Sequence, residues 1–276
     1  MERRFLQVDV FGRRPYAGNP LAVVLDAEGL GDAEMQRVAQ WTNLSETTFV
    51  LPPADPEADY RVRIFTPSRE LPFAGHPTLG TAFAWLTSGG EPRKSDLVVQ
   101  ECAAGLIPVR RDADRLAFAA PPLMREGPVE ESVVAEIVAS LGVERAAVVD
   151  AQWADNGPGW VAVLLGTADE VLAVRPGPVT YKIGVVGPHP AGASPAWEVR
   201  AFVPSAGGTT EDPVTGSLNA SVAQWLIGTG RAEPSYVAAQ GTAIGREGRI
   251  HIHRDPDGTI WVGGQTTPQI TGQIDL

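Results

Sequence analysis

Glu46, His76 and Asp212 are the side chains whose type and surroundings best suit the movement of a proton. Glu46 directly precedes an apolar, strand-like stretch, where partial burial would raise the pKa of its carboxyl and let it act as an acid or base near neutral pH. His76 and Asp212 each precede a proline, shortly before an apolar helical stretch. A solvated Glu46 with no chemical role remains the plain alternative.

His76 and Asp212 belong to an internal repeat. The matching segments are RIFTPS at 63–68 with RAFVPS at 200–205, and HPTLG at 76–80 with DPVTG at 212–216. Each copy reads as a strand, a loop and an apolar helix. The repeat predicts two domains of one design whose loops face a shared cleft, and it matches His76 with Asp212.

The starts of the two predicted helices are candidate anion sites. Gly75 lies at the first start, and Gly216 and Ser217 lie at the second. A helix N-terminus offers unpaired backbone N–H groups and a partial positive charge, which suit a substrate carboxylate. In the plain alternative, glycine and proline only shape the turns and Asp212 only caps its helix.

The composition favours short strands and many turns, with 30 glycines and 24 prolines in 276 residues. Helices that are apolar on most faces are enclosed by other elements. We therefore expect an α+β fold of two similar barrel-like domains, each a mostly antiparallel sheet around a central helix. The proline-rich segment 120–128 is the expected linker between an N-terminal domain, 1–119, and a C-terminal domain, 129–276, whose last strand could return to the first domain.

Charge and motif content argue against several function classes. A net charge of −11 without a basic stretch argues against nucleic acid, and no apolar run has membrane-spanning length. The single cysteine, Cys102, cannot form an intrachain disulfide, which indicates a cytoplasmic protein. His251 and His253 lack further ligands, and no nucleotide-binding loop is present, so we expect neither a metal nor an organic cofactor.

Motifs along nearly the whole chain resemble the PhzF-like (phenazine biosynthesis PhzF) family. They are VDVF at 8–11, GNPLAV at 18–23, NLSETTF at 43–49, FAGHPTLG at 73–80 and EDPVTGS at 211–217. The resemblance implies a diaminopimelate-epimerase-like fold, a homodimer and an isomerase that moves a proton without a cofactor. It implies that Glu46 is the acid/base, that His76 and Asp212 orient the substrate or assist the proton transfer, and that the backbone around Gly75, Gly216 and Ser217 holds the substrate carboxylate.

The expected activity is therefore proton movement on a small cyclic or conjugated carboxylic acid, as in the isomerisation of trans-2,3-dihydro-3-hydroxyanthranilate. One alternative is a non-catalytic binder of small acids on the same fold, and another is an epimerase or racemase of a related acid. The related epimerases use two cysteines at the helix starts, and His76 and Asp212 are expected to stand in those places here. A hydrolase is a further option, but no nucleophile triad is visible.

Overall fold

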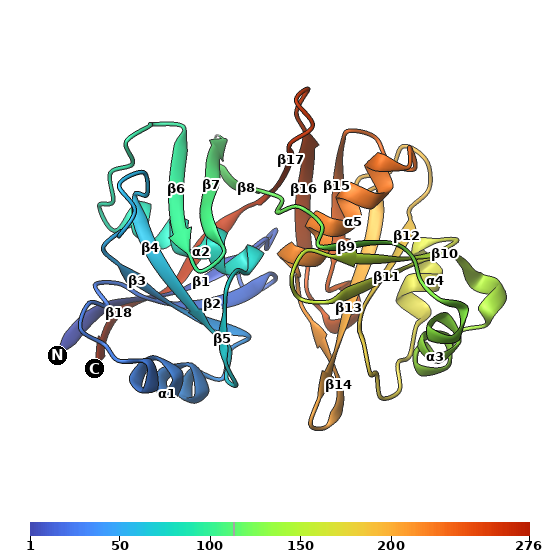
Figure 1. Ribbon diagram of the computed structural model, residues 1–276, viewed down its shortest axis with the longest axis horizontal. Coiled ribbons are helices and arrows are strands. Elements are labelled where there is room, and N and C mark those ends of the chain that lie inside the picture. The colour runs from blue at the N-terminus through green and yellow to red at the C-terminus, as the bar shows by residue number, and fades with distance from the viewer. Residues whose placement is uncertain (113) are drawn as a thin grey trace. The chain divides into compact units, whose positions relative to one another are not determined.

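The computed structural model describes residues 1–112 and 114–276. The chain forms two compact units: the first is Met1–Ala119 with Gly263–Leu276, and the second is Ala120–Val262. Each unit is a sheet with one central helix, α2 in the first and α5 in the second (Figure 1). Within the described ranges, no helix has the length and apolar character needed to cross a membrane.

The first unit surrounds α2 (Gly75–Thr87) with short strands. The strands are β1 (Glu2–Val10), β2 (Asn19–Val24), β3 (Glu46–Leu51), β4 (Tyr60–Phe65), β5 (Glu70–Leu71), β6 (Leu97–Cys102), β7 (Gly105–Asp112), β8 (Arg115–Ala119) and β18 (Thr266–Asp275). Most neighbours pair antiparallel, whereas β2 with β3 and β4 with β6 pair parallel. A second helix, α1 (Asp32–Thr42), buries only Met35, Val38 and Ala39.

The central position of α2 follows from its apolar and small side chains. Nine of its 13 residues are buried. Gly80 shows how closely the strands approach, because a Cβ atom there would lie 2.5 Å from Leu21 Cδ2 and 3.0 Å from Val10 Cγ2. A helix packed this closely by strands fixes the position of its first turn, which contains His76.

The second unit repeats the design around α5 (Gly216–Gly228). Its strands are β9 (Arg125–Pro128), β10 (Val148–Asp155), β11 (Trp160–Leu165), β12 (Lys182–Pro188), β13 (Trp197–Ser205), β14 (Gly208–Asp212), β15 (Ser235–Gln240), β16 (Gly248–Arg254) and β17 (Ile260–Gly264), the last of which crosses the unit boundary. Residues 120–128, the expected linker, lie in this unit, and β9 pairs with β10 there.

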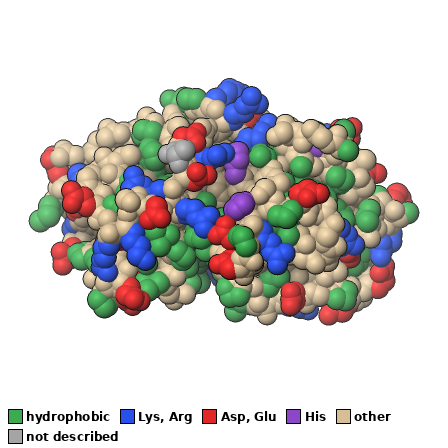
Figure 2. Space-filling view, turned by 90° about the horizontal axis from the view of Figure 1, so that it is seen from above, with side chains coloured by type: hydrophobic (Ala, Val, Ile, Leu, Met, Phe, Trp, Pro, Cys, Tyr) green, Lys and Arg blue, Asp and Glu red, His purple; other side chains and the backbone are tan. Residues whose placement is uncertain are grey.

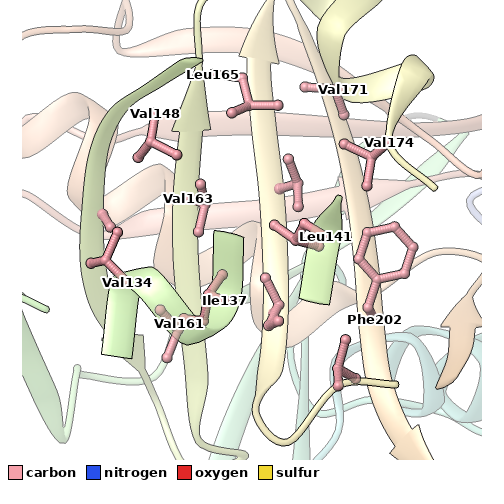
Figure 3. Packing of buried hydrophobic residues seen from close by; sticks show 14 residues of the cluster. Val134, Ile137, Leu141, Val148, Val161, Val163, Leu165, Val171, Val174 and Phe202 are labelled. Atoms are coloured by element: carbon pink, nitrogen blue, oxygen red, sulfur yellow. The ribbon is translucent and has the colours of Figure 1, made fainter. Parts of the chain in front are cut away.

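Two further helices, α3 (Glu131–Leu141) and α4 (Ala168–Ala173), complete the second unit. Figure 3 shows Ile137 of α3 beside Val161 of β11; Leu141 of α3 belongs to the same cluster of 14 buried apolar residues. The buried residues of α3, Val134, Ile137 and Leu141, are spaced three and four positions apart and so lie on one side, as expected for a helix that covers a sheet. This packing holds the β10–β13 part of the sheet in place.

The sequence repeat corresponds to a structural repeat of strand, hairpin partner and central helix. The first copy is β4, β5 and α2, and the second is β13, β14 and α5; both helices have 13 residues. The predicted α+β fold, mostly sheet with a central helix in each unit, is confirmed. Charged side chains of both signs lie intermixed on the face that Figure 2 shows.

Candidate active site

Glu46 and His76 lie together in the first unit. Glu46 is the first residue of β3 and His76 is the second residue of α2, and Glu46 Oε2 is 3.2 Å from His76 Nε2. The Glu46 side chain is 15% exposed and that of His76 only 5%. The Glu46 side chain is therefore partly exposed although its Oε2 is buried, whereas the imidazole is enclosed.

Burial keeps the His76 imidazole neutral. It lowers the pKa of His76 from 6.5 to about 3. Asn19 Nδ2 lies 3.4 Å from His76 Nδ1, so the amide can donate to an unprotonated Nδ1 and leave the ring proton on Nε2, beside Glu46. Nε2 and Oε2 are within hydrogen-bond distance but lack hydrogen-bond alignment, as catalytic groups often do until substrate binds.

The turn before β3 sets the position of Glu46. Asn43 ends α1 in the left-handed region, at φ 53°, a conformation that asparagine tolerates better than most residues. The chain then enters β3 at Glu46, opposite Leu21 of the parallel strand β2. The NLSETTF motif is thus a helix end and a strand start that together place one carboxylate.

A buried carboxylate to which the sequence analysis gave no role holds the loop that precedes Asn19. Asp9 is 3% exposed and accepts hydrogen bonds from the backbone N–H groups of Ala17 and Gly18, each at 3.0 Å. A Cβ at Gly18 would lie 2.2 Å from Val10 O, so this loop needs glycine. The available signal was an aspartate between two valines followed by a glycine-containing loop.

In the second unit, Asp212 is the last residue of β14. Asp212 Oδ2 accepts a 2.6 Å hydrogen bond from Thr215 Oγ1. Ser217 is the second residue of α5, and its Oγ accepts from Trp160 Nε1 at 3.0 Å. The backbone oxygen of Ser217 accepts from Asn156 Nδ2 at 2.9 Å. Trp160 and Asn156 lie far from Ser217 in sequence, and no motif pointed to them.

The structure corrects the match between the two loops. His76 has the place in α2 that Ser217 has in α5, whereas Asp212 ends a hairpin strand. Strand pairing sets this register, because Ile64 pairs with Leu71 in the first hairpin and Ala201 with Asp212 in the second. The structural equivalent of Asp212 is therefore Leu71. The match of His76 with Asp212, which rested on the resemblance of HPTLG to DPVTG, is wrong.

Both central helices begin without a side-chain cap from their N-cap residue. Those residues are Ala74 for α2 and Thr215 for α5, and neither side chain accepts a hydrogen bond from its helix. The backbone N–H groups at Gly75, Gly216 and Ser217 therefore receive no cap bond from these two residues, which leaves the helix starts suited to an anion.

Cys102 is the last residue of β6. Its thiol is buried and its Sγ lies 3.5 Å from Gly105 O. Burial raises the pKa of the Cys102 thiol, which disfavours the reactive thiolate.

Comparisons with known proteins agree with this architecture. Residues 8–272 match the family described as phenazine biosynthesis-like protein (PhzC-PhzF). The chain is 35% identical to antisense-enhancing sequence 1 of Schizosaccharomyces pombe, over 99% of this chain and 98% of that protein. It is 36% identical to the trans-2,3-dihydro-3-hydroxyanthranilate isomerase of Pseudomonas aeruginosa, over 92% and 91%.

A solved structure shows the same fold over the whole chain. The structure of a predicted epimerase from Pseudomonas aeruginosa superposes with a TM-score of 0.81 at 26% identity, covering 99% of each chain. With the match of the family across residues 8–272, this chain belongs to the phenazine biosynthesis-like PhzC-PhzF family and is an isomerase of that family.

Proposed function

We propose that this isomerase moves a proton on a small cyclic or conjugated carboxylic acid without a cofactor, and that Glu46 is its acid/base. The observation that carries the proposal is the partly exposed Glu46 side chain, whose Oε2 lies 3.2 Å from an imidazole that burial keeps neutral. A neutral imidazole can orient a carboxylate by hydrogen bonding without forming an ion pair that would weaken it as a base.

In the proposed reaction, Glu46 takes a proton from a carbon next to a conjugated system. The C–H electron pair moves into that system, and the protonated Glu46 then returns the proton at another carbon. The proton count of the substrate is unchanged, so no oxidant or reductant is required. The Nε2–H of His76 would orient Glu46 or stabilise the charge that develops on the substrate.

The substrate carboxylate would be held by the backbone at Gly75, Gly216 and Ser217. In a protein of net charge −11, an anion needs a local positive site, and helix starts provide one. Asp212 would orient the substrate through its carboxylate. These three glycine and serine positions and Asp212 thus serve binding and orientation, whereas Glu46 performs the proton transfer.

The relative from Pseudomonas aeruginosa is named for its action on trans-2,3-dihydro-3-hydroxyanthranilate, and we propose that acid, or a close analogue, as the first substrate to test. An epimerase activity has support from the predicted epimerase that shares the fold at 26% identity. A non-catalytic binder has less support, because binding alone does not require a partly exposed glutamate beside a neutral histidine.

The test is proton NMR of the purified protein with a panel of small conjugated carboxylic acids in D₂O, before and after dialysis against a chelator. Isomerisation predicts a shifted double bond, with deuterium at a new carbon to the extent that the protonated Glu46 exchanges with the solvent. Epimerisation would place deuterium at the original carbon with inverted configuration. Saturable binding without exchange or product would contradict the proposal and favour the non-catalytic binder.

We also propose a homodimer, from the family and from the frequency of two-fold symmetric dimers among soluble oligomers. Light scattering of the pure protein at micromolar concentration tests this, and the mass of a single chain would contradict it.

A further inference from the structure

We infer that Thr215 is a positioning residue that holds the Asp212 carboxylate as a hydrogen-bond acceptor, and that Gln240 holds Thr215 in place for this bond. The inference rests on the proposed function, because Asp212 matters there as the group that orients the substrate. It gives a role to two residues that had none so far, Thr215 within the EDPVTGS motif and Gln240 at the end of β15.

The first observation is a threonine at a helix start that does not cap its helix. Threonine at an N-cap usually accepts a hydrogen bond from a backbone N–H in the first turn. The Thr215 side chain forms no such bond to α5. Its hydroxyl instead donates to Asp212 Oδ2 at 2.6 Å, a length typical of a bond to a charged oxygen. Thr215 thus donates a hydrogen bond to the Asp212 carboxylate instead of capping α5.

The second observation is the fully buried amide of Gln240. Its Oε1 accepts from Thr215 N at 3.0 Å and from Asn219 Nδ2 at 2.8 Å. Its Nε2 donates to Asp212 O at 3.1 Å and to Thr215 Oγ1 at 2.9 Å. All four hydrogen-bonding positions of the amide are therefore used, at 0% exposure.

Together these bonds fix the orientation of the Gln240 amide. The backbone N–H of Thr215 can only donate, so the Gln240 oxygen must face it and the Gln240 nitrogen must face Thr215 Oγ1. Thr215 Oγ1 therefore accepts a hydrogen bond from Gln240, and because an ionised carboxylate can only accept, the hydroxyl proton of Thr215 points to Asp212 Oδ2. Asp212 is thus held as an acceptor, and its ionised form is favoured.

Charged residues also lie on the elements next to Asp212 in the second unit. Arg200 and Glu211, on β13 and β14, form an ion pair with each other at 2.7 Å. Arg246 packs against Gly241, where a Cβ would lie 2.6 Å from Arg246 Cβ and 2.7 Å from Pro213 O. Removal of the Thr215 hydroxyl leaves these three charged groups in place.

The decisive experiment is a titration of the free protein by carbon NMR, with ¹³C-labelled aspartate carboxyls and Asp212→Asn to assign the signal. The variants are Thr215→Val, which removes the hydroxyl, and Thr215→Ser, which retains it. We expect Thr215→Val to raise the pH at which Asp212 titrates by about one to two units, the equivalent of one charge-assisted hydrogen bond. Thr215→Ser should titrate like the wild type.

Thr78→Val is the matched control. Thr78 Oγ1 also accepts from a buried glutamine amide, Gln100 Nε2 at 2.9 Å, but it lies in the first unit and donates to Ala74 O. Its substitution should leave the Asp212 titration unchanged. If Thr215→Val does not fold, Thr215→Ala removes the same hydroxyl without placing a methyl group against the Gln240 amide.

An unchanged Asp212 midpoint in a folded Thr215→Val or Thr215→Ala variant would overturn the inference, as would a shift of the same size in Thr78→Val. The titration uses no substrate, so its result is independent of the isomerase proposal. Conversely, a wild-type protein that turns over no acid would contradict the proposed function while the titration still decides the role of Thr215.

Discussion

The two hairpins of the repeat carry the same arginine–glutamate pair at different burial, which allows a quantitative prediction. Arg200 binds Glu211 through both Nε and Nη2, at 3.0 and 2.7 Å, and the side chains are 5% and 11% exposed. Arg63 binds Glu70 through the same two atoms, at 2.7 and 2.6 Å, but the side chains are 25% and 37% exposed. Geometry is therefore matched, and burial differs.

Removal of one partner from the buried pair should cost far more than removal from the exposed pair. Arg200→Met leaves the Glu211 carboxylate buried without its guanidinium, and Val171 O and Val174 O lose their bonds from Arg200 Nη1. We expect a loss of about 3–5 kcal/mol in the free energy of unfolding. Arg63→Met leaves the Glu70 carboxylate where water can reach it, and we expect a loss of about 1 kcal/mol or less in the free energy of unfolding.

Urea unfolding, followed by hydrogen exchange of peptides from each unit, measures both losses separately. The double variant Arg200→Met/Glu211→Leu should recover much of the stability, because an apolar pair of similar volume avoids the buried charge. Equal losses for Arg200→Met and Arg63→Met would refute the reasoning. So would a double variant as unstable as Arg200→Met alone.

Three further predictions concern groups near the candidate site. His76 takes up a proton below pH 6.5 in the unfolded chain but only near pH 3 in the folded protein, so the free energy of unfolding should fall by about 1.4 kcal/mol for each unit by which the pH is lowered between these values. Urea unfolding of His76→Asn at several pH values should lack this component, and a pH dependence equal to that of the wild type would contradict the prediction. Trp160→Phe removes the donor to Ser217 Oγ and should raise KM about fivefold with kcat unchanged, an effect that must vanish in a Ser217→Ala background. Cys102→Ser should keep wild-type turnover and alkylation should not inhibit the folded protein, because the thiol is buried with a raised pKa; loss of activity in a folded variant would restore a thiol mechanism.

The family, the isomerase class and the α+β fold could be predicted from the sequence, because the informative signals are local. The motifs and the apolar character of α2 and α5 are visible in short windows, and the match over residues 8–272 confirms the family. The place of Glu46 beside a strand start was also predictable, since the preceding asparagine and the β-branched run after it mark the turn and the strand.

The register of the repeat and the supporting residues could not be predicted from local patterns. The strand pairing of the two hairpins makes Asp212 the structural equivalent of Leu71, a relation that the similarity of the sequences does not reveal. Trp160, Asn156 and Gln240 reach the α5 start from strands and loops 21 to 61 positions away, so only the folded chain brings them together. Burial of His76, which lowers its pKa, likewise depends on the whole unit.

The central claim is that the Glu46 carboxylate removes and returns the substrate proton, and Glu46→Gln in D₂O tests it most directly. The amide keeps the shape of the side chain but cannot act as a base, so the variant should fold and bind the substrate like the wild type. We expect it to lose about 10³-fold in kcat and in deuterium incorporation. Glu57→Gln, at an exposed position of the same unit, should retain both. Wild-type rates of turnover and exchange in Glu46→Gln would contradict the mechanism.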